Sequence, residues 1–397
     1  MKKTTNILSL LFAALSLCLL IYVRKDQPVK VPVETVYVTE YVDYEGNPYD
    51  ASAQTSETEP EVTPEPTPEP TPEPEPEYFT LSFIGDCALS SFNGGTRYAQ
   101  MMGDDYSYPF KNTAQYFLED EYTFANLECS FSDQNLYASA DRTFYTRCPT
   151  AYTQILTLGG VDYVTTANNH MDDFGQTGMD DTYAALEAAG IPYGKEGETE
   201  IITTPNGLKI GVYCAFANFM TSVTPDNIKD KVSGLKEQGA EYIVCCFHWG
   251  MEGKYTIYES QVNAAVAAVE AGADIVFGCH PHVLQQISEY EGGLIMYSLG
   301  NWSFGTNTHP SDPDTAIVQV TVRRDPDGTV STDSYSAIPC CVSSTFPPDF
   351  SNVKATDYND YVPTPYEEGS EHYERTMSKL NGTFEGGDLV IDYSAFH

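Results

Sequence analysis

Seven side chains of the kinds that bind metals follow short apolar segments in this 397-residue sequence. They include four of its seven histidines. The set is Asp86, Glu128, Asn169, His170, His248, His280 and His282. Borderline divalent metals prefer imidazole and carboxylate ligands, and two metals can share one carboxylate. The set therefore predicts a site for one or two divalent metals, with Mn, Zn or Fe as the candidates.

Each of these residues taken alone has a simpler explanation. A single histidine at a strand end is commonly a hydrogen-bonded loop residue, and Glu128 alone is compatible with a helix cap. The other histidines, His309, His372 and His397, lie in polar, turn-like segments. Because the candidates fall at five separate strand ends, we interpret them as members of one site.

The elements that must position these residues alternate between strands and helices. Strands are predicted at 79–84, 122–125, 161–166, 242–247, 275–277, 294–298, 316–323 and 329–338, and helices near 179–189 and at 259–271. This order is typical of an α/β fold with a sheet core and outer helices. Sites in open α/β sheets form at the carboxyl ends of strands, where the candidate ligands stand.

Around these residues the sequence resembles the CapA (poly-γ-glutamate capsule biosynthesis) family of the metallophosphoesterase-like superfamily. The resemblance covers roughly residues 79–305 and keeps the order and spacing of the family's stretches. These are Ile84-Gly85-Asp86, Ala125-Asn126-Leu127-Glu128, Thr166-Ala167-Asn168-Asn169-His170 with Asp173 and Gly175, His248-Trp249-Gly250 with Glu252, Gly278-Cys279-His280-Pro281-His282-Val283-Leu284-Gln285 and Tyr297-Ser298-Leu299-Gly300-Asn301. The resemblance implies a four-layer α/β/β/α sandwich of two mixed sheets over residues 78–345, followed by a C-terminal extension, 346–397.

The resemblance also implies a role for each site residue. Asp86 and His282 would hold one metal, Asn169, His248 and His280 the other, and Glu128 would bridge them. His170 would be the catalytic group, which donates to a leaving or developing anion without binding metal. The substrate-binding candidates are Asn126, Arg147, Glu252 and Asn301. Arg147 could bind a carboxylate through two hydrogen bonds, or it could be a surface residue of a proline-containing turn.

One position departs from the phosphoesterase pattern. Phosphoesterases commonly carry a histidine two residues after the first aspartate, and this chain has Ala88 there. The first metal site therefore lacks one ligand. We expect weaker binding at that site, and the departure disfavours phosphatase chemistry.

The composition restricts the partners. The chain has 20 Lys and Arg against 57 Asp and Glu, and residues 1–77 hold only 14 of these acids, so the folded part is itself acidic. This balance excludes nucleic acid, which is bound by clustered bases, and it disfavours docking on an anionic membrane surface. The cysteines form no Cys-x-x-Cys pair, which disfavours a structural zinc site. We expect most of the cysteines to be buried, and the sequence also allows one or two disulfides.

The N-terminal region predicts an anchor and a stalk. Residues 7–23 are apolar and lie between Lys2-Lys3 and Arg24-Lys25. As a helix they would span about 26 Å, close to the thickness of a bilayer core. No small-x-small cleavage site follows, which favours an uncleaved anchor, 1–25, over a signal peptide. The segment 26–77 ends in Thr-Pro-Glu-Pro repeats, which favour an extended polyproline stalk or an unstructured spacer.

Three functions remain open for the domain, which we expect outside the cytoplasm on a single-pass anchor in the cell membrane. The first is an accessory protein that assists synthesis, export or anchoring of poly-γ-glutamate, with membrane synthase subunits as candidate partners. The second is a metal-dependent hydrolase of another phosphoester, ester or amide. The third is a binding module with one metal or none. Because the polymer is an anion, metals or Arg147 would have to supply local positive charge on this acidic chain.

Overall fold

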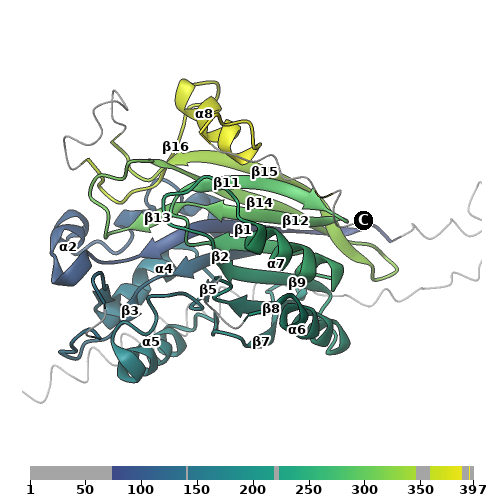
Figure 1. The fold of residues 1–397 in the computed structure, drawn as a ribbon, viewed down its shortest axis with the longest axis horizontal. Coiled ribbons are helices and arrows are strands. Elements are labelled where there is room, and N and C mark those ends of the chain that lie inside the picture. The colour runs from purple at the N-terminus through teal and green to yellow at the C-terminus, as the bar shows by residue number, and fades with distance from the viewer. Residues whose placement is uncertain (1–73, 140–141, 219–222, 346–357, 387–392, 394–397) are drawn as a thin grey trace, which may run out of the picture. The chain divides into compact units, whose positions relative to one another are not determined.

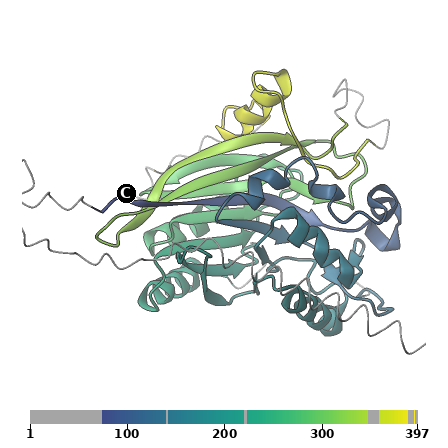
Figure 2. The same cartoon turned by 180° about the vertical axis from the view of Figure 1, so that it is seen from behind.

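The computed structural model describes residues 74–139, 142–218, 223–345, 358–386 and 393. They form two mixed β-sheets that pack face to face and carry helices on their outer faces (Figures 1 and 2). The predicted α/β/β/α sandwich is thus confirmed. The predicted anchor and nearly all of the stalk lie outside these residues. Within the described ranges, no helix has the length and apolar character needed to cross a membrane.

The first sheet has eight strands in the order β16-β15-β14-β1-β2-β5-β6, and β13 also pairs with β1. The strands are β1 (Glu77–Ala88), β2 (Tyr122–Leu127), β5 (Tyr163–Thr165), β6 (Tyr193–Gly194), β13 (Asn301–Phe304), β14 (Asp314–Arg324), β15 (Val330–Cys341) and β16 (Thr364–Pro365). Strands β1, β2, β5 and β6 run parallel, so their carboxyl ends meet at one edge.

The second sheet has six strands in the order β11-β12-β10-β9-β8-β7. They are β7 (Thr199–Thr203), β8 (Lys209–Ala215), β9 (Tyr242–His248), β10 (Ile275–Cys279), β11 (Leu284–Tyr290) and β12 (Gly293–Leu299). Strands β8, β9, β10 and β12 are parallel. A short parallel pair, β3 (Ser130–Phe131) and β4 (Arg147–Cys148), stands apart from both sheets.

Alternating side chains of the central strands fill the core on both faces of each sheet. In β1, Leu81 and Phe83 point into the core between the sheets, whereas Ile84 belongs to the core under the helices. In β9, Cys246 faces the other sheet and Cys245 faces the outer helices, as predicted for adjacent residues of a strand. The nine cysteines of the described residues are buried free thiols.

Helices cover the outer face of each sheet. Helices α2 to α5 contribute to the apolar core on the first sheet, and α6 and α7 to the core on the second. The helices are α2 (Arg97–Met102), α3 (Ala114–Leu118), α4 (Thr153–Gly159), α5 (Gly175–Ala189), α6 (Pro225–Glu237), α7 (Glu259–Glu270) and α8 (Glu371–Leu380), with short 3-10 turns η2 (Phe92–Gly94), η3 (Tyr108–Phe110) and η4 (Thr150–Tyr152). Helix α8 packs against β11, β14 and β15 and so contacts both sheets.

Two glycines bring the edges of the sheets together. The chain leaves β12 of the second sheet at Gly300, which has a φ of 68°, and enters β13, which pairs with β1 of the first. The amide N–H of Asp86 donates to the Gly300 carbonyl oxygen at 2.9 Å. A Cβ at Gly85 would lie 1.9 Å from that oxygen, so a glycine is required for this approach.

Helix α8 is held by a buried network of charges. The Nζ of Lys379 lies 2.6 Å from Asp312 Oδ1 and 2.8 Å from Asp314 Oδ2, and all three residues are buried. Arg375 adds an ion pair of 2.7 Å to Asp314. Burial would raise the pKa of Asp314, but Lys379 and Arg375 hold it below its usual value. Two cations thus balance two carboxylates out of water.

We expect Lys379→Met to lower the free energy of unfolding by about 3–5 kcal/mol, because it leaves buried carboxylates without their cation. Since the pKa of Asp314 is lowered in the folded state, its contribution is present above its ordinary pKa and is lost as the pH falls through the lowered value. Urea denaturation at several pH values should therefore show the free energies of unfolding of wild type and Lys379→Met becoming equal in acid.

The control is Lys229→Met, which removes an exposed ion pair with Glu270 of 2.7 Å. Exposed pairs contribute about 0–1 kcal/mol. Equal losses of stability in the two variants would contradict a special role for the buried network.

Candidate metal centre

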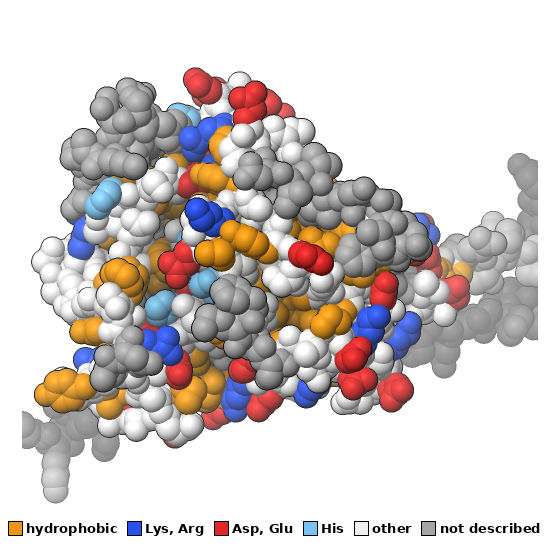
Figure 3. Space-filling model, in the orientation of Figure 1, with side chains coloured by type: hydrophobic (Ala, Val, Ile, Leu, Met, Phe, Trp, Pro, Cys, Tyr) orange, Lys and Arg blue, Asp and Glu red, His pale blue; other side chains and the backbone are white. Residues whose placement is uncertain are grey.

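The predicted metal ligands lie at the carboxyl ends of strands from both sheets. Asp86 stands near the end of β1, Glu128 directly follows β2, and Asn169 and His170 lie in the loop after β5. His248 is the last residue of β9, and His280 and His282 follow β10. The structure brings these side chains together at the edge where Gly85 meets Gly300. Histidine and acidic side chains also lie side by side on the face shown in Figure 3.

Asp86, Glu128 and His282 form one group whose ligand atoms all lie within 4.8 Å of one another. His282 Nδ1 is 3.0 Å from Asp86 Oδ2, and its Nε2 is 3.5 Å from Glu128 Oε1. Both carboxylates are buried. The imidazole therefore bridges two buried negative charges.

Glu128, His248 and His280 form a second group within the same limit of 4.8 Å. His248 Nε2 is 3.9 Å from Glu128 Oε1 and 2.8 Å from Asn169 Oδ1. Glu128 belongs to both groups, which is the position that a bridging carboxylate requires. Asn169 adjoins the second group because its side chain contacts His248.

Buried amides hold the carboxylates in place. Asn126 is fully buried, and its Nδ2 donates to Asp86 Oδ1 at 2.8 Å and to Glu128 Oε2 at 3.1 Å. Its own oxygen accepts from Asn168 Nδ2 at 3.1 Å. Asn301, also buried, pairs in register with Asp86 and donates to the carbonyl of His282 at 3.5 Å. These two asparagines, predicted to bind substrate, thus contact the candidate ligands.

His170 is oriented by Asp173, which belongs to the same stretch of the resemblance, and Asp173 in turn pairs with Arg142, which the sequence did not reveal. Its Nδ1 lies 2.9 Å from Asp173 Oδ2, and its Nε2 lies 3.9 Å from Glu128 Oε1. Arg142 lies 3.3 Å from Asp173, pairs with Asp172 and donates to the Asn169 carbonyl at 2.8 Å. Arg142 lies 31 positions before Asp173 in the sequence, so no local pattern indicates that the two residues meet.

Arg147 and Glu252 lie on different sides of the site. Arg147 is in β4, and its guanidinium lies 5.9 Å from the ring centroid of Phe174, four residues after His170. Glu252 is exposed, and its carboxylate lies within 4.8 Å of nitrogen atoms of His280 and His282. Ala88, in contrast, is fully buried in the apolar core under the helices.

The donor set fits a divalent cation. Among the described residues, Glu128 Oε1 and His280 Nδ1 are buried without a hydrogen-bond partner, although such atoms normally have one. Burial and the other histidines lower the pKa of His248 and bring that of His280 to about 3, so both imidazoles are neutral, as metal ligands must be. Burial opposes the charge on His282, yet Glu128 and Asp86 raise its pKa to about 10, so a metal bound here would have to displace the proton of His282.

Two of the candidate histidines have a strained backbone. His280 has a φ of 97° and His282 a φ of 56°, in the left-handed region that non-glycine residues rarely adopt. Such conformations cost about 1–3 kcal/mol each, and they occur mainly at functional sites where the surrounding structure enforces them. The strain is therefore consistent with a site in which imidazole direction matters.

Comparisons with known proteins agree with this picture. A family profile described as bacterial capsule synthesis protein PGA_cap matches residues 80–306, more than half of the chain. The capsule biosynthesis protein CapA of Bacillus anthracis is 28% identical over 272 residues, which are 62% of this chain and 64% of that protein. This chain thus spans slightly less than two thirds of that relative's length.

One further relative is similar in sequence, and one solved protein is similar in structure. The PGA biosynthesis protein CapA of Bacillus subtilis (strain 168) is 27% identical over 274 residues, covering 64% of this chain and 70% of that protein. The NAD nucleotidase of Haemophilus influenzae shares 13% identity at a TM-score of 0.40, over 80% of this chain and 64% of that chain.

We expect Asn126→Ala to disturb both carboxylates at once. Loss of a buried donor costs about 1–3 kcal/mol of stability, and loss of a residue that orients metal ligands typically weakens metal affinity about 10–100-fold. Thermal unfolding and manganese titration of the purified protein would measure both effects. The control is Asn206→Ala, at an exposed position where the amide bonds Glu121. Unchanged metal affinity in Asn126→Ala would show that the carboxylates need no such support.

Proposed function

This chain belongs to the family of bacterial capsule synthesis proteins PGA_cap, and we propose that it assists synthesis, export or anchoring of poly-γ-glutamate outside the membrane. The observation that supports this most is the cluster in which Glu128 joins His248 and His280 to Asp86 and His282. A cluster of this composition suits a divalent metal. We propose that one or two such metals, Mn, Zn or Fe, bind there.

The two groups would hold the metals separately. Asp86, Glu128 and His282 would hold one, and Glu128, Asn169, His248 and His280 the other. A bound metal supplies positive charge and Lewis acidity on an otherwise acidic protein. His170, fixed through its Nδ1 by Asp173, would direct its Nε2 toward the same point and donate a hydrogen bond or proton to a bound anion.

A pocket beside the cluster is our candidate for the polymer's approach. It is lined by side chains that include Arg142, Asn169, Tyr183 and Phe216, and has an open volume of about 800 Å³. The Phe216 ring lies 5.6 Å from that of His248, so the pocket adjoins the second group. Asp172 and Glu196 also line the pocket, and Arg142 already pairs with Asp172. A bound metal, with Arg147 near Phe174, would therefore supply the positive charge for the polymer's carboxylates.

Hydrolysis of another phosphoester, ester or amide is the second candidate function. The observation that favours it is the pairing of His170 with Asp173, because a metal that only binds a ligand needs no oriented proton donor. His170→Ala separates the two functions. In an accessory protein it should cost one hydrogen bond to the bound polymer, whereas in a hydrolase it should abolish turnover.

The proposed function predicts that His248→Ala loses surface polymer. In cells that make poly-γ-glutamate, this variant should bind less metal and retain no more surface polymer than a deletion strain, because His248 belongs to the metal-binding group. Elemental analysis of the full-length protein and quantification of cell-bound polymer measure the two effects. His309→Ala, at an exposed histidine outside the cluster, is the control. Wild-type polymer levels in His248→Ala would reject the proposal.

We also propose that residues 1–25 anchor the chain and that residues 78–397 lie outside the cytoplasm. The apolar run between basic residues and the proline-rich segment support this arrangement. Protease added to intact protoplasts should release the folded domain. Protection of that domain from protease, with a cytoplasmic control protein also protected, would contradict the arrangement.

A further inference from the structure

Glu252 forms a third group with His280 and His282, and the metal ligands assigned above do not include Glu252. Oxygen of Glu252 and nitrogens of His280 and His282 all lie within 4.8 Å of one another. We propose that Glu252 is itself a metal ligand and completes the first metal site, in place of the side chain missing at position 88. This inference rests on the metal site proposed above and replaces the substrate-binding role expected for Glu252.

The backbone holds Glu252 against the two histidines. The amide N–H of Trp249 donates to the Cys279 carbonyl at 3.0 Å, and that of Gly253 donates to the Pro281 carbonyl at 2.8 Å. Glu252 thus lies between two hydrogen bonds to the segment that carries His280. Gly250 and Gly253, with φ of 75° and 67°, permit the tight turn between these bonds.

Side chains fix both ends of the same loop. At its start, the buried indole of Trp249 donates to the Tyr297 carbonyl at 2.8 Å. Beyond Glu252, Gln285 Nε2 donates to the carbonyls of Lys254 and Thr256 at 3.0 and 3.1 Å. Tyr255 donates to Asp312 at 3.0 Å. The loop therefore has little freedom to carry Glu252 away from the histidines.

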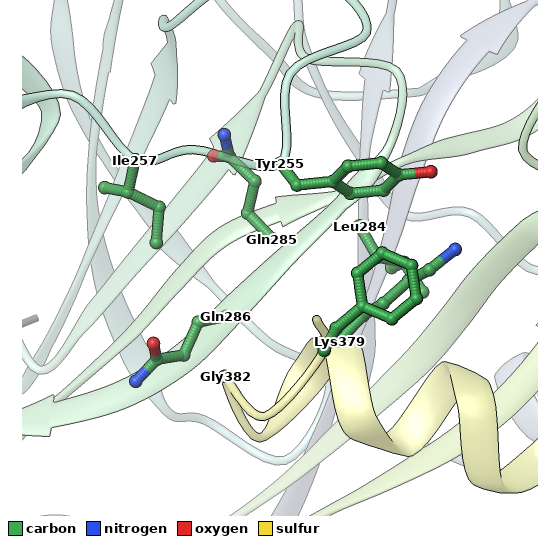
Figure 4. A pocket seen from close by; sticks show the side chains of 8 residues that line it. Tyr255, Ile257, Leu284, Gln285, Gln286, Lys379 and Gly382 are labelled. Atoms are coloured by element: carbon green, nitrogen blue, oxygen red, sulfur yellow. The ribbon is translucent and has the colours of Figure 1, made fainter. Parts of the chain in front are cut away.

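Figure 4 shows the pocket where this end of the loop meets helix α8. Tyr255, Gln285 and Lys379 are among the side chains that line it. Lys379, whose Nζ lies 5.1 Å from the ring centroid of Tyr255, also pairs with Asp312. The buried charges that hold α8 thus also support the loop of Glu252.

Charge favours a metal over an anionic substrate as the partner of Glu252. An exposed carboxylate would repel a carboxylate of the polymer, since the two carry the same charge. Glu252 stands close enough to Glu128 and His282 to affect both electrostatically. With Asp86 and Glu128 it brings three carboxyl groups to a space that suits a divalent cation.

The position of Ala88 agrees with this assignment. That residue is buried among apolar side chains, so β1 supplies the first metal with Asp86 alone. Asp86, Glu128 and His282 leave room in the coordination sphere for one more protein ligand. Glu252 reaches the same histidine, His282, from the solvent side.

Metal titration of the full-length Glu252→Gln variant tests this inference. We expect wild type to bind two Mn²⁺ ions, and the variant to bind one of them at least ~10-fold more weakly. Calorimetry and elemental analysis after dialysis give stoichiometry, and Co²⁺ absorption reports the ligand set directly. The control is Glu289→Gln, which removes the same charge at an exposed position of β11.

Salt separates a direct ligand from a nearby charge. At about 1 M ionic strength the screening length is about 3 Å, so an effect through solvent should disappear, whereas loss of a ligand should persist. Equal stoichiometry and affinity in the two proteins, or a difference that vanishes in salt, would overturn the inference while the metal site stands. Absence of any bound metal from wild type would overturn the metal site and this inference together.

Discussion

The close approach of two backbones, at Gly85 and Gly300, is the contact on which the geometry of the site depends. Gly85 lies in β1 of the first sheet, and Gly300 is the point where the chain leaves β12 of the second sheet. A Cβ at Gly85 would prevent the contact. Because the sheets meet there, carboxylates from β1 and β2 face imidazoles that follow β9 and β10. Separate sheets would leave two half-sites, each without the ligands that the other sheet supplies.

The site is costly to fold, and the rest of the domain offsets that cost. Buried carboxylates and strained histidines are unfavourable taken singly. They persist because the donors around them are fixed, as Asn126 is by Asn168, and because three apolar cores enclose the two sheets. A metal would relieve the remaining electrostatic cost, so folding and metal binding should reinforce each other.

Sequence reasoning succeeded where chemistry follows a local pattern. His248 and His280 could be placed because each stands at the end of a short, buried apolar strand. The four-layer sandwich was predicted from the resemblance and is confirmed. Contacts without such a pattern were missed. Arg142 meets Asp173 across 31 positions that include β4, α4 and β5, and Lys379 meets Asp312 across 67. The sequence around Arg142 or Lys379 contains no pattern that predicts these contacts.

The network around Lys379 also sets an order of events. A chain is made from its N-terminus, so β1 is complete long before β14, its antiparallel neighbour, and before α8. Until α8 emerges, Asp312 and Asp314 have no Lys379 or Arg375 and favour water over the interior. Burial of these two carboxylates would therefore follow the docking of α8, and the pairing of β14 with β1 would gain its full stability only at that step.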